Sequence, residues 1–389
     1  MRSSSGTLGF PMAVILGLNA VIGAGIFGVP AVLQTQAGSI GLISYLFVIG
    51  AVLCMALALA RMAALYPSDS VFYNYPKLWA GNAGGIAATV AYVLGLVIAL
   101  GLMAQIAGSY VALYSPFLST HLWAGILVSG VTLLCLMGGK ASTVTQIVLI
   151  ILTILPLVFI TTLCFSKASI SNLTPLAPYG IMGAFVAIKV VVFGFFGFEA
   201  IPSLFSSIKE PQKNVPRAII ATIVIAGAVY FVFTAAIMMA LPRALFTSSA
   251  TPLSSALLVQ FSNYKWLVAF INWSIIITIA GTLHSMLLSV SALVVDTGSR
   301  IGVRSERFNR PMVLIGMGCL ALVSASVFSS LDLMFSLTSL GIVSAYAAAI
   351  VPLLTYERGG VRKERKVAIA GLLGAALIFL CGLFGVFGV

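Results

Sequence analysis

An apolar run from about residue 8 to residue 33 carries Gly23, Gly25 and Gly28 near its centre. The run is long enough to cross the hydrocarbon core of a bilayer as a helix. Glycine is a poor helix former, so the backbone can unwind at this cluster. In lipid, unwound backbone is tolerated only where it is buried in protein or lines a cavity. The run therefore predicts a broken transmembrane helix whose free N–H and C=O groups face a polar group inside the protein.

Further apolar runs follow along the whole chain. The sequence is 61% hydrophobic and 7% charged, whereas a soluble domain has about 25% charged residues. We therefore expect an all-α integral membrane protein. About eleven spans are predicted by length and hydropathy, at residues 8–33, 38–60, 84–113, 121–138, 142–165, 180–206, 216–240, 264–298, 311–329, 332–355 and 366–388.

The positive charges indicate how these spans are oriented. The chain holds 20 Lys and Arg residues and has a formal net charge of +12. With a cytoplasmic N-terminus, only Lys167, Arg243 and Lys265 fall in outer loops. Because inner loops of membrane proteins are enriched in Lys and Arg, this distribution favours that orientation. We expect a multi-pass protein of the inner or plasma membrane, and no nucleic-acid partner.

A second interruption lies in the sixth predicted span, where Gly194 and Gly197 stand beside Glu199. Interrupted spans in matching positions of two halves are typical of transporter binding sites. We therefore expect two inverted five-helix repeats, residues 1–165 and 166–360, with broken helices 1 and 6, and one extra C-terminal span at 361–389. Half-helix N-termini suit a carboxylate and free carbonyls suit an ammonium group. Close helix packing is the alternative explanation for either glycine pair.

Three motifs resemble those of the amino acid–polyamine–organocation (APC) superfamily. Residues 23–27 (GAGIF), followed by Val29-Pro30, resemble its helix-one signature, G-[SA]-G-[IV]-F with a later proline. Residues 195–199 (FFGFE) resemble the F-x-G-x-E of its helix six, and residues 208–218 (IKEPQKNVPRA) resemble the stretch that follows. The resemblance covers spans one to ten. The superfamily usually has twelve helices, and we expect eleven here.

The resemblance implies how a substrate is held. The backbone N–H groups of Ala24 and Gly25 would bind a carboxylate. The carbonyls of Val21, Phe193 and Phe196 would bind an amino group, and Phe193 would occupy the position of a gating aromatic residue.

Two charged residues fall within the sixth span, where a charge costs about 2.5–3.5 kcal/mol on insertion scales. Lys189 either lines the outer vestibule or extends its ammonium group to the membrane interface. Glu199 is either a gating or proton-sensitive carboxylate or a structural acceptor for free N–H groups of the broken helix.

Three further polar residues have weaker assignments. His284, beside Ser285 in the eighth span, either binds substrate or a proton or forms a hydrogen bond between helices. Asp296 is expected to pair with Arg300 at i+4, and Asp332 to be a solvated outer-loop residue.

Other functional classes are disfavoured by the motifs. The chain has 2 His, no H-E-x-x-H motif and no cluster of carboxylates within a span, so we expect neither an enzyme nor a metal or cofactor site. The Gly138-Gly139-Lys140 turn lacks the P-loop pattern, and nothing resembles a repeated filter loop of a channel.

We therefore expect a secondary active transporter or exchanger of amino acids that works by alternating access, with proton coupling or exchange as candidate drives. Apolar walls favour a neutral L-amino acid; the alternative is a cationic amino acid or polyamine antiporter. The expected substrate-binding residues are Val21, Ile22, Gly23, Ala24, Gly25, Ile26, Phe193, Gly194, Phe196, Gly197, His284 and Ser285, and the expected gating or coupling residues are Glu199, Lys189 and Phe193.

Overall fold

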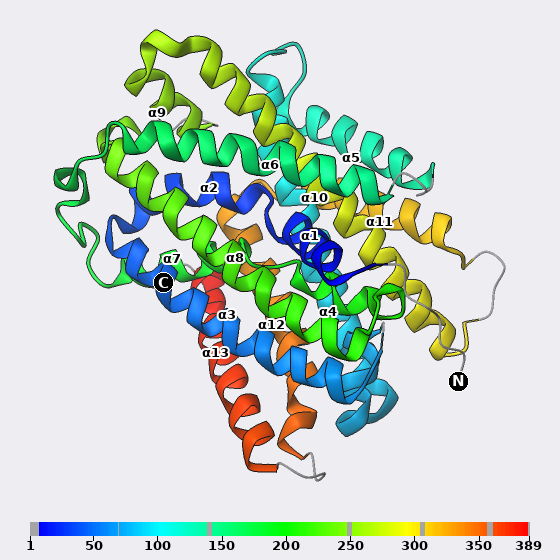
Figure 1. Cartoon of the computed structure of the whole chain (residues 1–389). Helices are drawn as coiled ribbons and strands as arrows, with labels where there is room; N and C mark the ends of the chain where they lie inside the picture. Colours follow the sequence, from blue (N-terminus) through cyan, green and yellow to red (C-terminus); the bar gives the residue numbers. More distant parts are fainter. Residues whose placement is uncertain are drawn as a thin grey trace.

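The computed structural model describes residues 8–68, 70–137, 142–246, 251–303, 308–355 and 361–387, and these residues form helices joined by short connections (Figure 1). The predicted all-α class is confirmed. The Gly138-Gly139-Lys140 turn lies outside the described residues. The α-helices are α1 (Phe10–Val21), α2 (Ala24–Val32), α3 (Ile40–Leu65), α4 (Val71–Ala112), α5 (Thr120–Leu136), α6 (Ser142–Phe165), α7 (Met182–Phe193), α8 (Pro211–Ala240), α9 (Pro252–Gln260), α10 (Lys265–Arg300), α11 (Arg310–Val327), α12 (Leu331–Ile350) and α13 (Val361–Phe387).

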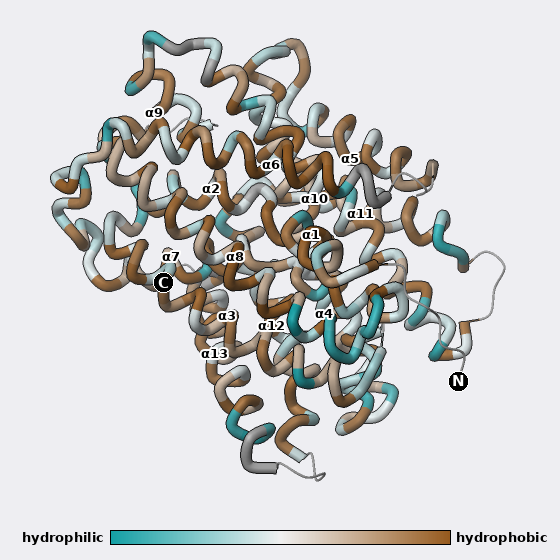
Figure 2. The backbone as a smooth tube through the Cα atoms, in the orientation of Figure 1, coloured by the Kyte–Doolittle hydropathy of each residue, from teal (hydrophilic) through white to brown (hydrophobic). Residues whose placement is uncertain are grey.

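The long helices account for the expected membrane spans. Among the described residues, 9 helical segments are long and apolar enough to cross a membrane, and the bent pair α1–α2 makes this 10 if it forms one span. The shorter apolar helix α5 coincides with the remaining predicted segment. Hydrophobic residues run along the helices, and hydrophilic residues gather mostly at helix ends and connections (Figure 2).

The first span is broken where the sequence predicts. Helix α1 ends at Val21, and Gly23 adopts φ −132° and ψ −144°, which is not helical. The axes of the two halves differ by 44°. Helix α2 continues into a π-helical segment, Leu33–Ala37.

The sixth span is also interrupted, but its second half differs from the first. Helix α7 ends at Phe193, and Gly197 adopts φ 122°, a conformation that only glycine adopts readily. The chain then forms two short 3-10 segments, Phe198–Ala200 and Pro202–Ser207, instead of an α-helix. Pro202 contributes to this outcome because it has no backbone N–H.

Glycines permit a close crossing between α4 and α12. A Cβ atom on Gly341 would lie 2.8 Å from the carbonyl oxygen of Ala91 and 2.8 Å from the Cα atom of Gly95. The two backbones are therefore in direct contact, as small residues permit in membrane proteins.

Ion pairs lie near the helix ends. Arg61 of α3 pairs with Glu364 of α13. The predicted pairing of Asp296 with Arg300 is confirmed, with an N–O distance of 2.8 Å, and the Ser70 hydroxyl also donates to Asp296.

We predict that Gly341→Ala destabilises the protein because the added methyl group meets backbone atoms that cannot move aside. Overpacking of this kind costs about 1–3 kcal/mol. Gly50→Ala in α3 is the control, since a Cβ atom there meets nothing within 4 Å. Thermal unfolding in detergent should show a lower midpoint for Gly341→Ala and none of this loss for Gly50→Ala. Equal unfolding midpoints for the two variants would contradict the direct backbone contact between α4 and α12.

Candidate functional site

The two interruptions touch each other in the middle of the bundle. A Cβ atom on Gly25 would lie 2.6 Å from the Cα atom of Gly194. A Cβ atom on Gly197 would collide with the carbonyl group of Ala20. The backbone of the broken first span therefore lies directly against that of the sixth, and both interruptions are buried in protein.

A small cavity opens beside this contact. It is about 20 Å³ in volume, which is room for about one water molecule. Five predicted site residues line it: Val21, Gly23, Gly25, Phe193 and Phe196. The structure brings these residues together, while their role in binding a substrate stays a prediction.

Other predicted residues lie beside the cavity without lining it. Ile22 and Ile26 are buried in the surrounding core. Gly194 and Gly197 form the backbone contact between the spans. The backbone of Ala24 begins α2 directly after the break.

The remaining walls include residues that the sequence analysis did not select. The lining residues from α4 are Leu96, Ala99 and Met103, and those from α10 are Thr282 and Met286. The α4 residues share one helical face by their spacing. In a chain this apolar, many helical faces have the same pattern, so spacing alone could not identify this one.

The carbonyl groups at the end of α1 have hydroxyl donors. The Tyr230 hydroxyl of α8 donates to the Val21 carbonyl at 2.7 Å. The Thr282 hydroxyl lies 3.1 Å from the Ile22 carbonyl and 3.3 Å from that of Asn19. At the other half-helix, the N–H groups of Ala24 and Gly25 have no acceptor within α2 because they belong to its first turn. The break thus presents N–H donors beside carbonyls that already have partners.

Ser285 belongs to a buried polar network that crosses three helices. Asn19 Nδ2 donates to Gln146 Oε1 at 2.6 Å, and Gln146 Nε2 donates to Ser285 Oγ at 3.3 Å. His284 is not among the residues that line the cavity. Its backbone carbonyl accepts from the Cys135 thiol of α5 at 3.7 Å, and its Nδ1 atom is buried without a partner among the described residues. The structure therefore does not bring the His284 side chain to the cavity.

Glu199 is held by three donors. It is 1% exposed, and its carboxylate accepts from the Tyr92 hydroxyl at 2.9 Å, from the Gly197 N–H at 2.9 Å and from the Tyr346 hydroxyl. Tyr92 lies on α4 and Tyr346 on α12. This arrangement favours the structural alternative, in which Glu199 satisfies a free N–H group of the broken helix and ties it to two neighbours.

Lys189 and Asp332 form an ion pair at one end of the site, with an N–O distance of 2.7 Å. The prediction that Asp332 lies in a loop is wrong, because it lies in the first turn of α12, while its side chain is 44% exposed and pairs with the buried Lys189. One turn closer to the cavity, the rings of Phe193 and Phe335 meet edge to face at 4.9 Å. Two successive contacts therefore join α7 to α12 on this side.

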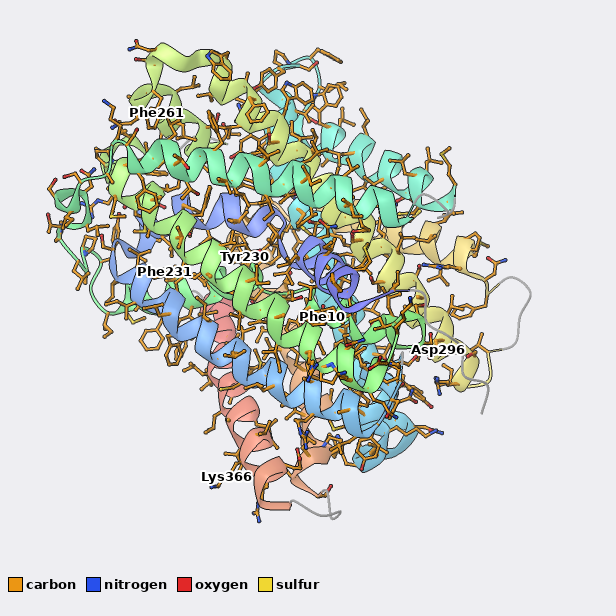
Figure 3. The ribbon with its side chains drawn as sticks, in the orientation of Figure 1. Phe10, Tyr230, Phe231, Phe261, Asp296 and Lys366 are labelled. Carbon is orange, nitrogen blue, oxygen red and sulfur yellow. The ribbon has the colours of Figure 1, made fainter. Side chains whose placement is uncertain are left out.

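Backbone hydrogen bonds also fix the N-terminal end of the first span. The Leu8 N–H donates to the Ser207 carbonyl at 3.1 Å, and the Lys209 N–H donates to the Leu8 carbonyl at 2.8 Å. These bonds join the start of α1 to the end of the interrupted sixth span. In Figure 3 Phe10, at the beginning of α1, is labelled near the centre of the view and Phe261 near its upper left.

Comparison with known proteins identifies relatives of this chain. A family model described as amino acid permease matches residues 8–389. An uncharacterized transporter of Mycobacterium tuberculosis is 28% identical over 385 residues, covering 95% of this chain and 85% of that protein. The branched-chain amino acid permease BcaP of Bacillus subtilis is 26% identical over 286 residues, covering 66% and 59%. Cationic amino acid transporter 3, mitochondrial, of Arabidopsis thaliana is 25% identical over 310 residues, covering 72% and 50%.

One solved structure has the same fold. It is that of Mhp1, a nucleobase-cation-symport-1 family transporter, in a closed conformation with bromovinylhydantoin bound. The TM-score is 0.66 at 12% sequence identity, and the match covers 100% of this chain and 94% of that one.

We predict that Gly25→Ala weakens substrate binding at least tenfold, about 1.4 kcal/mol, because the methyl group would push the two interruptions apart. Gly28→Ala is the matched control on the same helix, since a Cβ atom there meets nothing within 4 Å. Equilibrium binding to purified protein measures both. If Gly25→Ala bound substrate with wild-type affinity, the contact between Gly25 and Gly194 would not belong to the binding site.

We predict that Glu199→Gln lowers the transport rate by the same factor at every pH. The glutamine side chain offers one acceptor oxygen to three donors, so one donor loses its partner at a cost of about 1–3 kcal/mol. Uptake measured from pH 5 to 8 in reconstituted vesicles checks this. A pH profile that changes shape would instead indicate proton sensing by Glu199.

Proposed function

The chain belongs to the amino acid permease family, and from this membership we propose that it is a secondary transporter of a neutral L-amino acid. The family and its relatives are transporters, so the substrate is a small molecule and the activity is not enzymatic. A multi-span protein with bacterial relatives fits a place in the plasma membrane, and the charge distribution supports a cytoplasmic N-terminus.

The observation that carries the proposal is the lining of the central cavity, where no residue is charged. Free N–H groups at the start of α2 suit the carboxylate of an amino acid. Val21, Phe193 and Phe196, whose carbonyls the family resemblance assigns to the ammonium group, line the same cavity, and the Val21 carbonyl that accepts from Tyr230 has a second lone pair. Leu96, Met103 and Met286 surround the remaining space with apolar side chains. A neutral, apolar substrate side chain fits these surroundings.

A cationic substrate is the second candidate, and one relative is named a cationic amino acid transporter. A buried cationic side chain would need an anionic partner. Glu199 lies nearby in sequence, but its oxygens already accept from Tyr92, Tyr346 and Gly197. The relative named for branched-chain amino acids agrees better with the apolar walls.

The closed cavity is too small for an amino acid, which supports a cycle of alternating access. To admit one from outside, α7 must move away from α12, which separates Lys189 from Asp332 and Phe193 from Phe335. To release it inside, the start of α1 must leave the end of the sixth span. In this proposal residues 1–165 and 166–360 are the inverted repeats, and one group of helices rocks against the other. Proton coupling or exchange of one amino acid for another would drive the cycle.

We predict that unlabelled leucine, isoleucine and methionine inhibit leucine uptake into reconstituted vesicles, while arginine and polyamines at equal concentration do not. The reason is the absence of an available carboxylate at the cavity lining. Uptake with and without sodium and proton gradients, in the same vesicles, identifies the coupling. Competition by arginine as strong as that by leucine would favour the cationic alternative.

A further inference from the structure

A second and larger pocket lies about one helix away from the central cavity, at the end of the bundle where α2 finishes. It is about 410 Å³ in volume, within the usual range for small-molecule sites. Its walls come from the π-helical end of the first span, the connection between α6 and α7, and the connection after α8, with lining residues that include Gln34, Ser39, Asn172, Tyr179 and Arg243. It shares no lining residue with the central cavity.

The pocket walls are fixed by hydrogen bonds that reach between the three segments. Asn172 Nδ2 donates to the Met239 carbonyl at 2.7 Å, and the Ile40 N–H donates to the Leu176 carbonyl at 2.7 Å. Gln34 Nε2 donates to the Leu241 carbonyl at 3.1 Å. The α6–α7 connection is therefore attached both to the end of α8 and to the start of α3, and the pocket has a defined shape.

Two buried polar side chains in the pocket have atoms without protein partners. Gln34 is 2% exposed, and its Nε2 atom makes the hydrogen bonds that fix the side chain. Its Oε1 atom accepts from none of the described residues. Ser39 is 4% exposed and makes no side-chain hydrogen bond to the start of α3. Both residues line the pocket, so an acceptor oxygen and a hydroxyl that no described residue occupies are available there to a ligand.

Arg243 supplies the positive charge of the pocket. Its guanidinium lies over the Tyr179 ring, 5.4 Å from the centroid, and it forms no ion pair with a described residue. A guanidinium held by stacking keeps its planar fork available for a carboxylate. Pro175, Pro178 and Phe246 add apolar surface. The pocket thus offers a cation, an acceptor and an apolar wall, which match the carboxylate, ammonium group and side chain of a neutral amino acid.

We propose that this pocket is an outer binding site for the transported amino acid, which recruits it while the central cavity is closed. The proposal rests on the proposed function for the identity of the ligand. Gln34 and Thr35 belong to the π-helical continuation of α2, whose first residues face the central cavity. A ligand held there would contact the far end of the helix whose first turn lines the central cavity.

The test combines binding and uptake. Purified protein in phosphatidylcholine nanodiscs is titrated with radiolabelled leucine, and uptake is measured in vesicles of the same lipid. The wild-type protein should bind leucine at two classes of site, one central and one in the outer pocket. Arg243→Gln should keep only the central class of binding site, raise the KM for uptake about tenfold and leave the kcat for uptake unchanged. Lys167→Gln, an exposed cation that does not line the pocket, should match wild type in both measurements.

The other possible results distinguish the proposal of an outer site from the proposed transport function. Saturable leucine uptake with one binding class, unaltered in Arg243→Gln, would overturn the outer site and leave the proposed function standing. Binding that Arg243→Gln removes, in a protein without leucine uptake, would support the pocket and overturn the proposed function. If addition of phosphatidylglycerol abolished the leucine binding that depends on Arg243, a lipid phosphate would occupy the pocket. This result would overturn the proposal of an amino acid site there.

Discussion

Backbone polar groups in a membrane must be satisfied within the protein, and the contact between the two interrupted spans meets this constraint. Gly25 lies against Gly194, and Gly197 lies against the carbonyl group of Ala20. Neither span could be broken at mid-membrane if its free groups faced lipid. By breaking against each other, the spans enclose a place where the first N–H groups of α2 have no acceptor within their own helix.

Hydroxyl groups from neighbouring helices hold this arrangement in place. Tyr230 bonds the Val21 carbonyl, and Thr282 lies within hydrogen-bonding distance of the Ile22 carbonyl. Tyr92 and Tyr346 bond Glu199, which in turn accepts the N–H of Gly197. Four helices outside the broken spans therefore contribute donors or contacts that fix the broken backbone. The lining of the cavity stays free of charge, while the charged residues Lys189 and Asp332 pair above it.

The glycine positions explain why so much of the fold could be predicted from the sequence. Span length, the break at Gly23 and the turn at Gly194 and Gly197 all follow from local properties of the chain, namely apolar length and backbone freedom. Five of the residues that the glycine breaks and the family resemblance indicated, among them Gly25 and Phe193, line one cavity. His284 was chosen from its chemistry within an apolar span, and the structure does not bring its side chain to the cavity. Asp332 was assigned to a loop from its polarity, yet it lies in α12 and pairs with a lysine 143 positions away.

The sequence by itself determined that this is a membrane protein with two broken spans, because hydrophobic length and glycine content act locally. It also indicated the family through three short motifs. Only the tertiary structure decided which faces of α4 and α10 complete the cavity, which tyrosines bond Glu199, and which loops gather around Arg243. These choices depend on how helices far apart in the chain pack against one another, and in a chain where most helical faces are apolar, no local pattern distinguishes one face from the next.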